Sequence, residues 1–155
     1  MGEIIKKEEI EMYHQPKPAA IARRLAAQYW GPVQRQRKLS NGIWWFTTAG
    51  HGGFVVDLDV RPELKEFQSD VFRRERLYEH EQHFAAFEED CMAPIVEWTY
   101  PEIMASIQKA LIEPYRSMPF DEFVRERKED LYSSLARWNP NWLIRYPEPG
   151  VPASK

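Results

Sequence analysis

The spacing of apolar residues predicts an amphipathic helix in the first quarter of the chain. Ile21, Leu25 and Tyr29 recur every four residues, with polar side chains between them. This spacing places the three side chains on one face of a helix. The Gly-Pro pair at 31–32 ends the pattern, because neither residue continues a helix well. We therefore expect a helix over 19–30.

The pattern then changes to the shorter period of strands. A loosely alternating run comes first, followed by the aromatic and β-branched run 43–48 and a third β-rich run at 54–58. An Asn-Gly turn at 41–42 joins the first two runs, and the glycine-rich segment 49–53 joins the second and third. The sequence predicts a small antiparallel three-stranded meander over about 33–58.

Helical spacing returns after the strands. Pro62 and Glu63 suit the first turn of a helix, and we expect this helix to continue through Phe84 and Phe87. The fold class is therefore α+β, with the meander packed against four to five helices. The later helices are expected over 92–98, from Pro101 to before Pro114, and after Asp121, the last with Phe123, Leu131, Leu135 and Trp138 facing inward.

The length predicts a single domain over 1–155. Residues 1–18 alternate charged and apolar side chains, which is typical of a short strand, a short helix or a flexible arm that orders on a partner. The tail 139–155 contains four prolines, so we expect it to be extended and to wrap the body.

Composition narrows the class of protein. The apolar fraction of 43% and the aromatic fraction of 14% support a packed core. The net charge of −3 argues against both a strongly basic nucleic-acid binder and an acidic DNA mimic. The single cysteine excludes an intrachain disulfide. Without a secretory signal or an apolar run long enough to span a bilayer, we expect a cytoplasmic protein.

The turn around His51 is the first candidate for chemistry. An imidazole between glycines is expected to be exposed, with accessible backbone amides beside it, which suits proton transfer or contact with an anion. Three glycines in four positions indicate either positive φ angles or the close approach of another group. The alternative interpretation is a turn that only closes a hairpin. The glycines are Gly50, Gly52 and Gly53.

An acidic run and the lone cysteine form the second candidate. Glu88, Glu89 and Asp90 suit the N-terminus of the following helix, and they could instead bind a divalent cation or face a basic partner. A helix N-terminus would also lower the pKa of Cys91. With His51 as base and one of the acids orienting it, Cys91 becomes a candidate nucleophile, in the His-before-Cys order of circularly permuted papain-like hydrolases. The alternative is a small buried core residue.

A basic cluster suggests a third function. Arginines interleaved with tryptophans are typical of surfaces on which nucleic-acid bases stack, although arginines on an exposed strand usually form a solvated face. His80 and His83 are three residues apart, which is not the spacing of a His-Glu-x-x-His zinc site, so neither a metal nor a cofactor is expected. The cluster consists of Arg23, Arg24, Arg35, Arg37 and Lys38.

Several of these residues occur together in a known pattern. The segment 45–54, Trp-Phe-Thr-Thr-Ala-Gly-His-Gly-Gly-Phe, is followed by Tyr78 and by Phe-Glu-Glu-Asp-Cys at 87–91. This combination resembles an uncharacterised domain of bacteriophage and plasmid proteins, and the likeness covers about residues 43–104. Gly50 stands where a serine is common in that family, so a role for a hydroxyl group is absent here.

The hairpin also resembles, more distantly, the Trp-x-Phe…Gly-Gly-Phe strand of KlcA/ArdB-type antirestriction proteins. These resemblances imply a mobile-element setting, in which small proteins often bind and disable host defence enzymes. They imply no reaction, because the family itself has no assigned chemistry.

Three functions therefore compete. The first is a phage- or mobile-element-type binding protein, with a host defence protein such as a nuclease as its candidate target for inhibition. The second is a cysteine hydrolase with a Cys91–His51 pair oriented by an acid such as Glu89. The third is a nucleic-acid-binding module. The oligomeric state stays open. The contact residues expected for the binding protein are Trp44, Gly50, His51, Gly52, Gly53, Glu88, Glu89 and Asp90.

Overall fold

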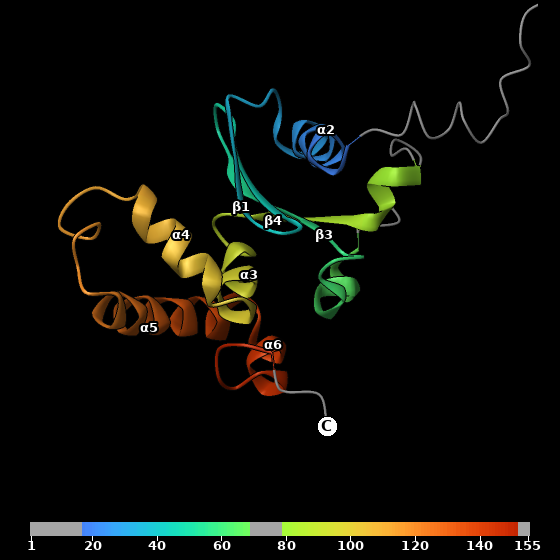
Figure 1. Ribbon diagram of the computed structural model, residues 1–155. Coiled ribbons are helices and arrows are strands. Elements are labelled where there is room, and N and C mark those ends of the chain that lie inside the picture. Colours follow the sequence, from blue (N-terminus) through green and yellow to red (C-terminus); the bar gives the residue numbers. More distant parts are fainter. Residues whose placement is uncertain (1–16, 69–78, 152–155) are drawn as a thin grey trace, which may run out of the picture.

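The computed structural model describes residues 17–68 and 79–151 and contains an antiparallel sheet with helices on both faces (Figure 1). The sheet has the order β1-β2-β3-β4, so each strand pairs with the next one along the chain. The α+β class and the meander of the first three strands are confirmed, and a fourth strand extends the sheet. The strands are β1 (Arg35–Ser40), β2 (Ile43–Thr47), β3 (Gly52–Asp57) and β4 (Phe84–Glu88).

The prediction of a helix that runs from Pro62 through Phe87 is wrong. A 3-10 helix over Pro62–Phe67 and a second one over Glu79–His83 precede β4. Phe84 and Phe87 are three residues apart, which fits a helix, but here Phe87 pairs with Phe54 on β3. Tyr78, part of the resemblance, lies outside the described residues.

The helices form two layers. Helix α2 (Pro18–Trp30) covers one face of the sheet, and the C-terminal helices lie on the other face (Figure 1). The first helix and the later ones begin close to their predicted positions, because prolines and acidic residues mark their first turns. The C-terminal layer consists of α3 (Ala93–Thr99), α4 (Glu102–Ala110), α5 (Phe120–Trp138) and α6 (Pro140–Arg145).

Because both faces are covered, successive side chains of a strand enter different cores. On β3, Val55 faces the α2 layer, whereas Phe54 and Val56 face the C-terminal layer. The two-residue period of a strand gives this alternation. It explains why β2, β3 and β4 read as nearly continuous apolar runs and not as alternating ones.

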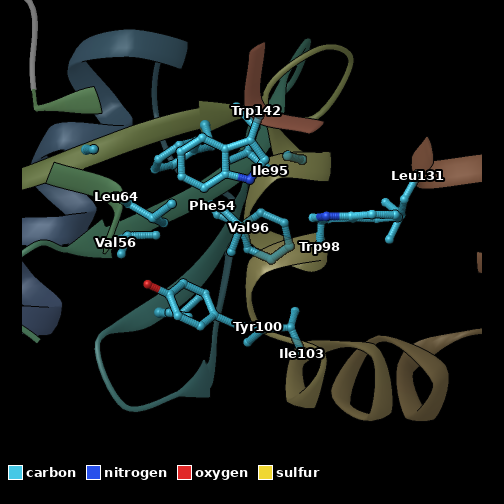
Figure 2. Close-up of a cluster of buried hydrophobic side chains, with 14 of the residues drawn as sticks. Phe54, Val56, Leu64, Ile95, Val96, Trp98, Tyr100, Ile103, Leu131 and Trp142 are labelled. Atoms are coloured by element: carbon cyan, nitrogen blue, oxygen red, sulfur yellow. The ribbon is translucent and has the colours of Figure 1, made fainter. Parts of the chain in front are cut away.

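The core on the C-terminal side is built around α3 (Figure 2). Trp98 is fully buried, and its indole Nε1 donates a hydrogen bond of 2.8 Å to the carbonyl oxygen of Tyr146. Trp142 is also buried and donates from Nε1 to Thr99 Oγ1 at 3.2 Å. The two indoles therefore fix α3 to the C-terminal end of the chain through polar contacts as well as through apolar packing.

Two expectations for the C-terminal end are corrected. The tail after Asn139 is not extended from its start, because Pro140 opens α6 and suits the first turn of a helix. The chain does return to the body, since the Gly150 amide donates to the Trp98 carbonyl at 2.8 Å. Trp138 does not face inward but is 54% exposed, because α5 ends there.

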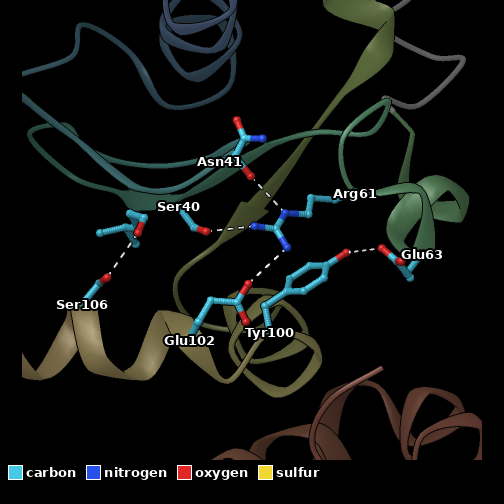
Figure 3. A network of polar contacts seen from close by, with 8 residues as sticks. Ser40, Asn41, Arg61, Glu63, Tyr100, Glu102 and Ser106 are labelled. Atoms are coloured by element: carbon cyan, nitrogen blue, oxygen red, sulfur yellow. Dashed lines mark hydrogen bonds and ion pairs between the residues drawn. The ribbon is translucent and has the colours of Figure 1, made fainter. Parts of the chain in front are cut away.

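Arg61 joins the β1–β2 turn to the C-terminal layer (Figure 3). Its Nε donates to the Asn41 carbonyl at 3.0 Å, and its two Nη atoms donate to Ser40 Oγ and Glu102 Oε1. The guanidinium also lies 4.5 Å from the ring centre of Tyr100. One side chain thus links the turn with the start of α4.

Among the residues that the structure describes, none of the helices combines the length and the apolar character needed to cross a membrane.

Candidate functional site

The turn between β2 and β3 is closed by Thr48 and His51. The Thr48 amide donates to the His51 carbonyl at 2.8 Å, and the His51 amide donates to Thr48 Oγ1 at 3.2 Å. The His51 side chain is 52% exposed, as the sequence predicts. Its amide, however, is used within the turn, and Gly52 and Gly53 belong to β3 and are buried. Of the three glycines only Gly50 is exposed, so the turn presents an imidazole with fewer accessible amides beside it than expected.

The imidazole pairs with the acidic run. His51 Nδ1 lies 3.2 Å from Glu88 Oε1. The sheet brings the two residues together, because Gly53 pairs with Glu88 across β3 and β4, and His51 stands two residues before Gly53. The hydrogen bond to this acid fixes the orientation of the ring. Base and orienting acid, two of the three roles proposed from the sequence, are thus in contact.

Close approach of other groups, and not a positive φ angle, accounts for the glycine at position 53. None of Gly50, Gly52 and Gly53 has a positive φ. A Cβ on Gly53 would lie 2.6 Å from the Trp30 ring and would clash with the Phe87 carbonyl oxygen. The indole at the end of α2 therefore lies against bare backbone of β3, which fixes the helix on the sheet.

The acidic run does not cap α3. That helix begins at Ala93 with Met92 as N-cap, and its first turn contains no acidic residue. Glu88 instead ends β4, and the Glu89 amide donates to the Gly52 carbonyl at 2.9 Å. Pairing with β3 extends the strand into the run, which shifts the acids away from the helix. Within 17–68 and 79–151, no three His, Cys, Asp or Glu side chains are grouped to hold a metal ion.

Cys91 is partly buried, and its environment disfavours the thiolate. Burial raises the pKa of the thiol, and the nearby carboxylates of Glu88 and Asp90 raise it further. The expectation of a lowered pKa is wrong, because Cys91 precedes the N-cap residue Met92 and has acids as neighbours. The hydrogen bond of His51 Nδ1 goes to Glu88.

The environment of Cys91 predicts a slow reaction of its thiol with an alkylating reagent. We expect Cys91 in the folded protein to react with iodoacetamide more slowly at pH 8 than a cysteine in an unstructured peptide, because the thiolate fraction is lower. Glu88→Gln removes one of the charges that raise the pKa and should speed the reaction. Glu122→Gln, an exposed acid on α5, serves as control and should change nothing. A midpoint of the rate–pH profile below the ordinary thiol pKa would contradict the assignment.

Asn139 joins the end of α5 to this region. Its Nδ2 donates to the Cys91 carbonyl at 2.8 Å. The residue before it, Trp138, is 54% exposed, and the Arg137 guanidinium lies 4.9 Å from a Trp138 ring centre. Helical spacing predicts that Trp138 faces the core, whereas the structure places it on the surface. Its position at the last turn of α5 is the signal that could have revealed it.

The basic cluster is spread over two elements and is partly used in internal contacts. Arg23 donates to Gln36 Oε1 at 2.6 Å, and Arg24 pairs with Glu81 at 3.3 Å. Arg37 donates to the Ser106 carbonyl at 2.5 Å. The remaining members, Arg35 and Lys38, are exposed on the edge strand β1.

Trp44 is not available for contact with a partner. Its side chain is 5% exposed and packs in the core beneath α2, with its ring centre 6.2 Å from that of Phe84. The expectation that Trp44 contacts a partner is therefore wrong: the aromatic run 43–48 predicts a strand but not which of its side chains a helix covers.

A buried ion pair was also missed. Glu97 on α3 is 4% exposed, and its Oε2 accepts from Arg127 Nε at 2.8 Å and from Arg127 Nη2 at 2.6 Å. Burial raises the pKa of Glu97, and Arg127 partly offsets this effect. The signal in the sequence is a single acid inside the apolar run 93–98, which normally needs a buried partner.

A family model described as a domain of unknown function (DUF7007) matches residues 23–142. No curated protein and no solved structure matches the chain.

Proposed function

The chain belongs to the DUF7007 family, a domain family of unknown function, and we propose that it is a small protein-binding domain of the phage or mobile-element type. Its proposed partner is a host defence protein, which it inhibits by covering a functional surface. The proposed contact surface contains His51, the acidic run 88–90 and Trp138.

The observation that carries this proposal is the contact between Asn139 and the Cys91 carbonyl. It brings the exposed indole of Trp138 to the same end of the molecule as the acidic run. Tryptophan and arginine are the residues most often found at the energetic centre of protein interfaces, and Arg137 lies over Trp138. Exposed acids at the rim would steer a basic partner toward the indole.

The negative charge of the acidic run 88–90 indicates the chemistry of the partner. Glu89 and Asp90 are exposed, and Glu88 is partly exposed beside His51. A surface that binds DNA phosphates is rich in lysine and arginine. A nuclease of a host defence system offers such a surface, and an inhibitor that covers it would block access of the enzyme to DNA. The resemblance to mobile-element proteins supports the same class of partner.

The proposal predicts which substitutions abolish binding. We expect the immobilised protein to capture one host protein stoichiometrically from bacterial lysate, and the purified partner to bind Trp138→Ala about 30-fold more weakly, the typical loss of about 2 kcal/mol for a central tryptophan. Glu89→Gln combined with Asp90→Asn should slow association and weaken its salt dependence. The measurement is surface plasmon resonance at two salt concentrations.

The matched control is Ile112→Ala, which removes another exposed apolar side chain from the segment that precedes α5. It should bind as the wild type does. Inhibition of the partner's nuclease activity should follow the same order of variants. Equal binding by all the variants, or a partner whose activity is unaffected, would contradict the proposal.

A cysteine hydrolase is the second candidate, favoured by the contact between His51 and Glu88. The raised pKa of Cys91 works against it, so the alkylation profile described above decides between the two. A hydrolase would need a thiolate that forms near neutral pH.

A further inference from the structure

A pocket of about 290 Å3 lies on the other side of the molecule from α2, between the edge of the sheet and the C-terminal layer. Strands β1 and β2 form one wall, and α3, α4 and α5 form the others. Arg37 and Trp45 face each other across the two strands, since they are direct partners in the register. The apolar lining consists of Leu39, Trp45, Ile107, Ala110 and Leu111.

Three charged side chains also line the pocket, namely Arg37, Glu97 and Arg127. Glu97 is buried and is held by two nitrogen atoms of Arg127. The pair fixes one guanidinium at the pocket wall, whereas Arg37 is tethered from the other side by the Ser106 carbonyl. The two positive groups are therefore positioned by protein contacts before any ligand arrives.

The guanidinium groups retain donors for a ligand. Nε and Nη2 of Arg127 both contact the Glu97 carboxylate, and one Nη atom of Arg37 donates to the Ser106 carbonyl. Among the residues that the structure describes, Arg127 Nη1 and the two other nitrogens of Arg37 have no partner. Two cations against one already paired carboxylate leave the pocket with a net positive charge, which favours an anion over a cation.

We propose that this pocket binds a small apolar carboxylate. The ring or branched chain of the ligand packs against Trp45 and the aliphatic side chains, and its carboxylate accepts hydrogen bonds from Arg37 and Arg127. A concave apolar site with a few convergent polar groups is the usual form of a ligand pocket, and this volume suits a ligand of one or two rings. The site is separate from the contact surface proposed above, and neither proposal depends on the other.

The probe is 2-naphthoate, measured by isothermal titration calorimetry against its neutral isostere 2-naphthamide. We expect the acid to bind the wild-type protein at least 10-fold more tightly than the amide, because only the acid forms charge-assisted hydrogen bonds with the guanidinium groups. Arg37→Gln should weaken binding of the acid about 10-fold and reduce the preference over the amide by the same factor, because Arg127 remains in the pocket.

Two further variants distinguish binding in this pocket from non-specific electrostatic attraction of the acid to the protein surface. Arg35→Gln removes the same charge from the same strand but from outside the pocket, and it should leave the preference intact. Ala110→Phe fills the mouth of the pocket from an exposed position at the end of α4, and it should abolish binding of both compounds. Equal affinity for acid and amide, equal loss in Arg35→Gln, or binding that survives Ala110→Phe would overturn the proposal. So would the absence of saturable binding of 2-naphthoate to the wild type.

Discussion

Replacing Gly53 with alanine is expected to lower the free energy of unfolding by about 3 kcal/mol or more, at the upper end of what overpacking costs in a tightly packed interior. The added Cβ would clash with the Phe87 carbonyl oxygen and would lie 2.6 Å from the Trp30 indole. Neither neighbour can move cheaply, because one belongs to the backbone of β4 and the other ends α2. Urea unfolding followed by tryptophan fluorescence measures the loss.

The other two glycines of the turn provide graded controls. Nothing lies within 4 Å of a Cβ on Gly50, so Gly50→Ala should be neutral, or stabilising by up to about 1 kcal/mol through the unfolded state. A Cβ on Gly52 would lie 3.1 Å from Glu89 Oε2, a side-chain atom that can move, and 3.2 Å from the backbone carbonyl oxygen of Phe46, which can give way less. Gly52→Ala should therefore fall between the two. Equal stability of the Gly50 and Gly53 variants would contradict this account of the turn.

Replacing Arg127 with methionine should lower the free energy of unfolding by about 3 kcal/mol at pH 7, because it leaves a buried carboxylate without its partner. This figure is the lower end of the usual range, since Arg127 is about one-third exposed. The loss should depend on pH. The folded-state pKa of Glu97 is raised, and removing Arg127 raises it further.

The sign of the pH dependence follows from that direction. The pKa of the Glu97 carboxyl is higher in the folded state than its ordinary value of 4.5. Such a group lowers the free energy of unfolding as the pH rises above 4.5 and through the folded-state pKa. The variant should therefore approach the wild type near pH 4.5 and diverge from it toward pH 7. Unfolding in urea at a series of pH values measures the difference.

The double variant Glu97→Leu with Arg127→Met is the control. It removes both charges and should recover most of the lost stability, because apolar residues of similar size often replace a buried ion pair without loss. A double variant as unstable as Arg127→Met alone would mean that the guanidinium stabilises the fold through its packing and not through Glu97.

The sequence predicted those parts of the fold that local patterns encode. Helix α2 follows from the spacing of Ile21 and Leu25, and the first three strands follow from their turns. Strand β4 was not predictable in the same way. Phe84 and Phe87 have helical spacing, and only their pairing with β3 makes them a strand. Long-range pairing overrides local preference at such segments.

The candidate site also contains some features that local patterns predict and others that depend on long-range packing. The hypothesis that His51 meets the acidic run needed no more than the two motifs, and the contact with Glu88 agrees with it. Glu97 and Arg127 are 30 residues apart, on helices whose packing no local pattern specifies. Trp138 was assigned to the core because helical spacing gives the face of a helix but not where its neighbours end.

The two-sided sheet has a consequence for synthesis of the chain on the ribosome. The core beneath α2 uses residues between Ile21 and Phe84, whereas the opposite core also needs residues as late as Trp142. A nascent chain therefore exposes one apolar face of the sheet until the last helices emerge. Shortened chains that end before α5 retain this exposed face, which makes them natural substrates for chaperones and for proteolytic quality control.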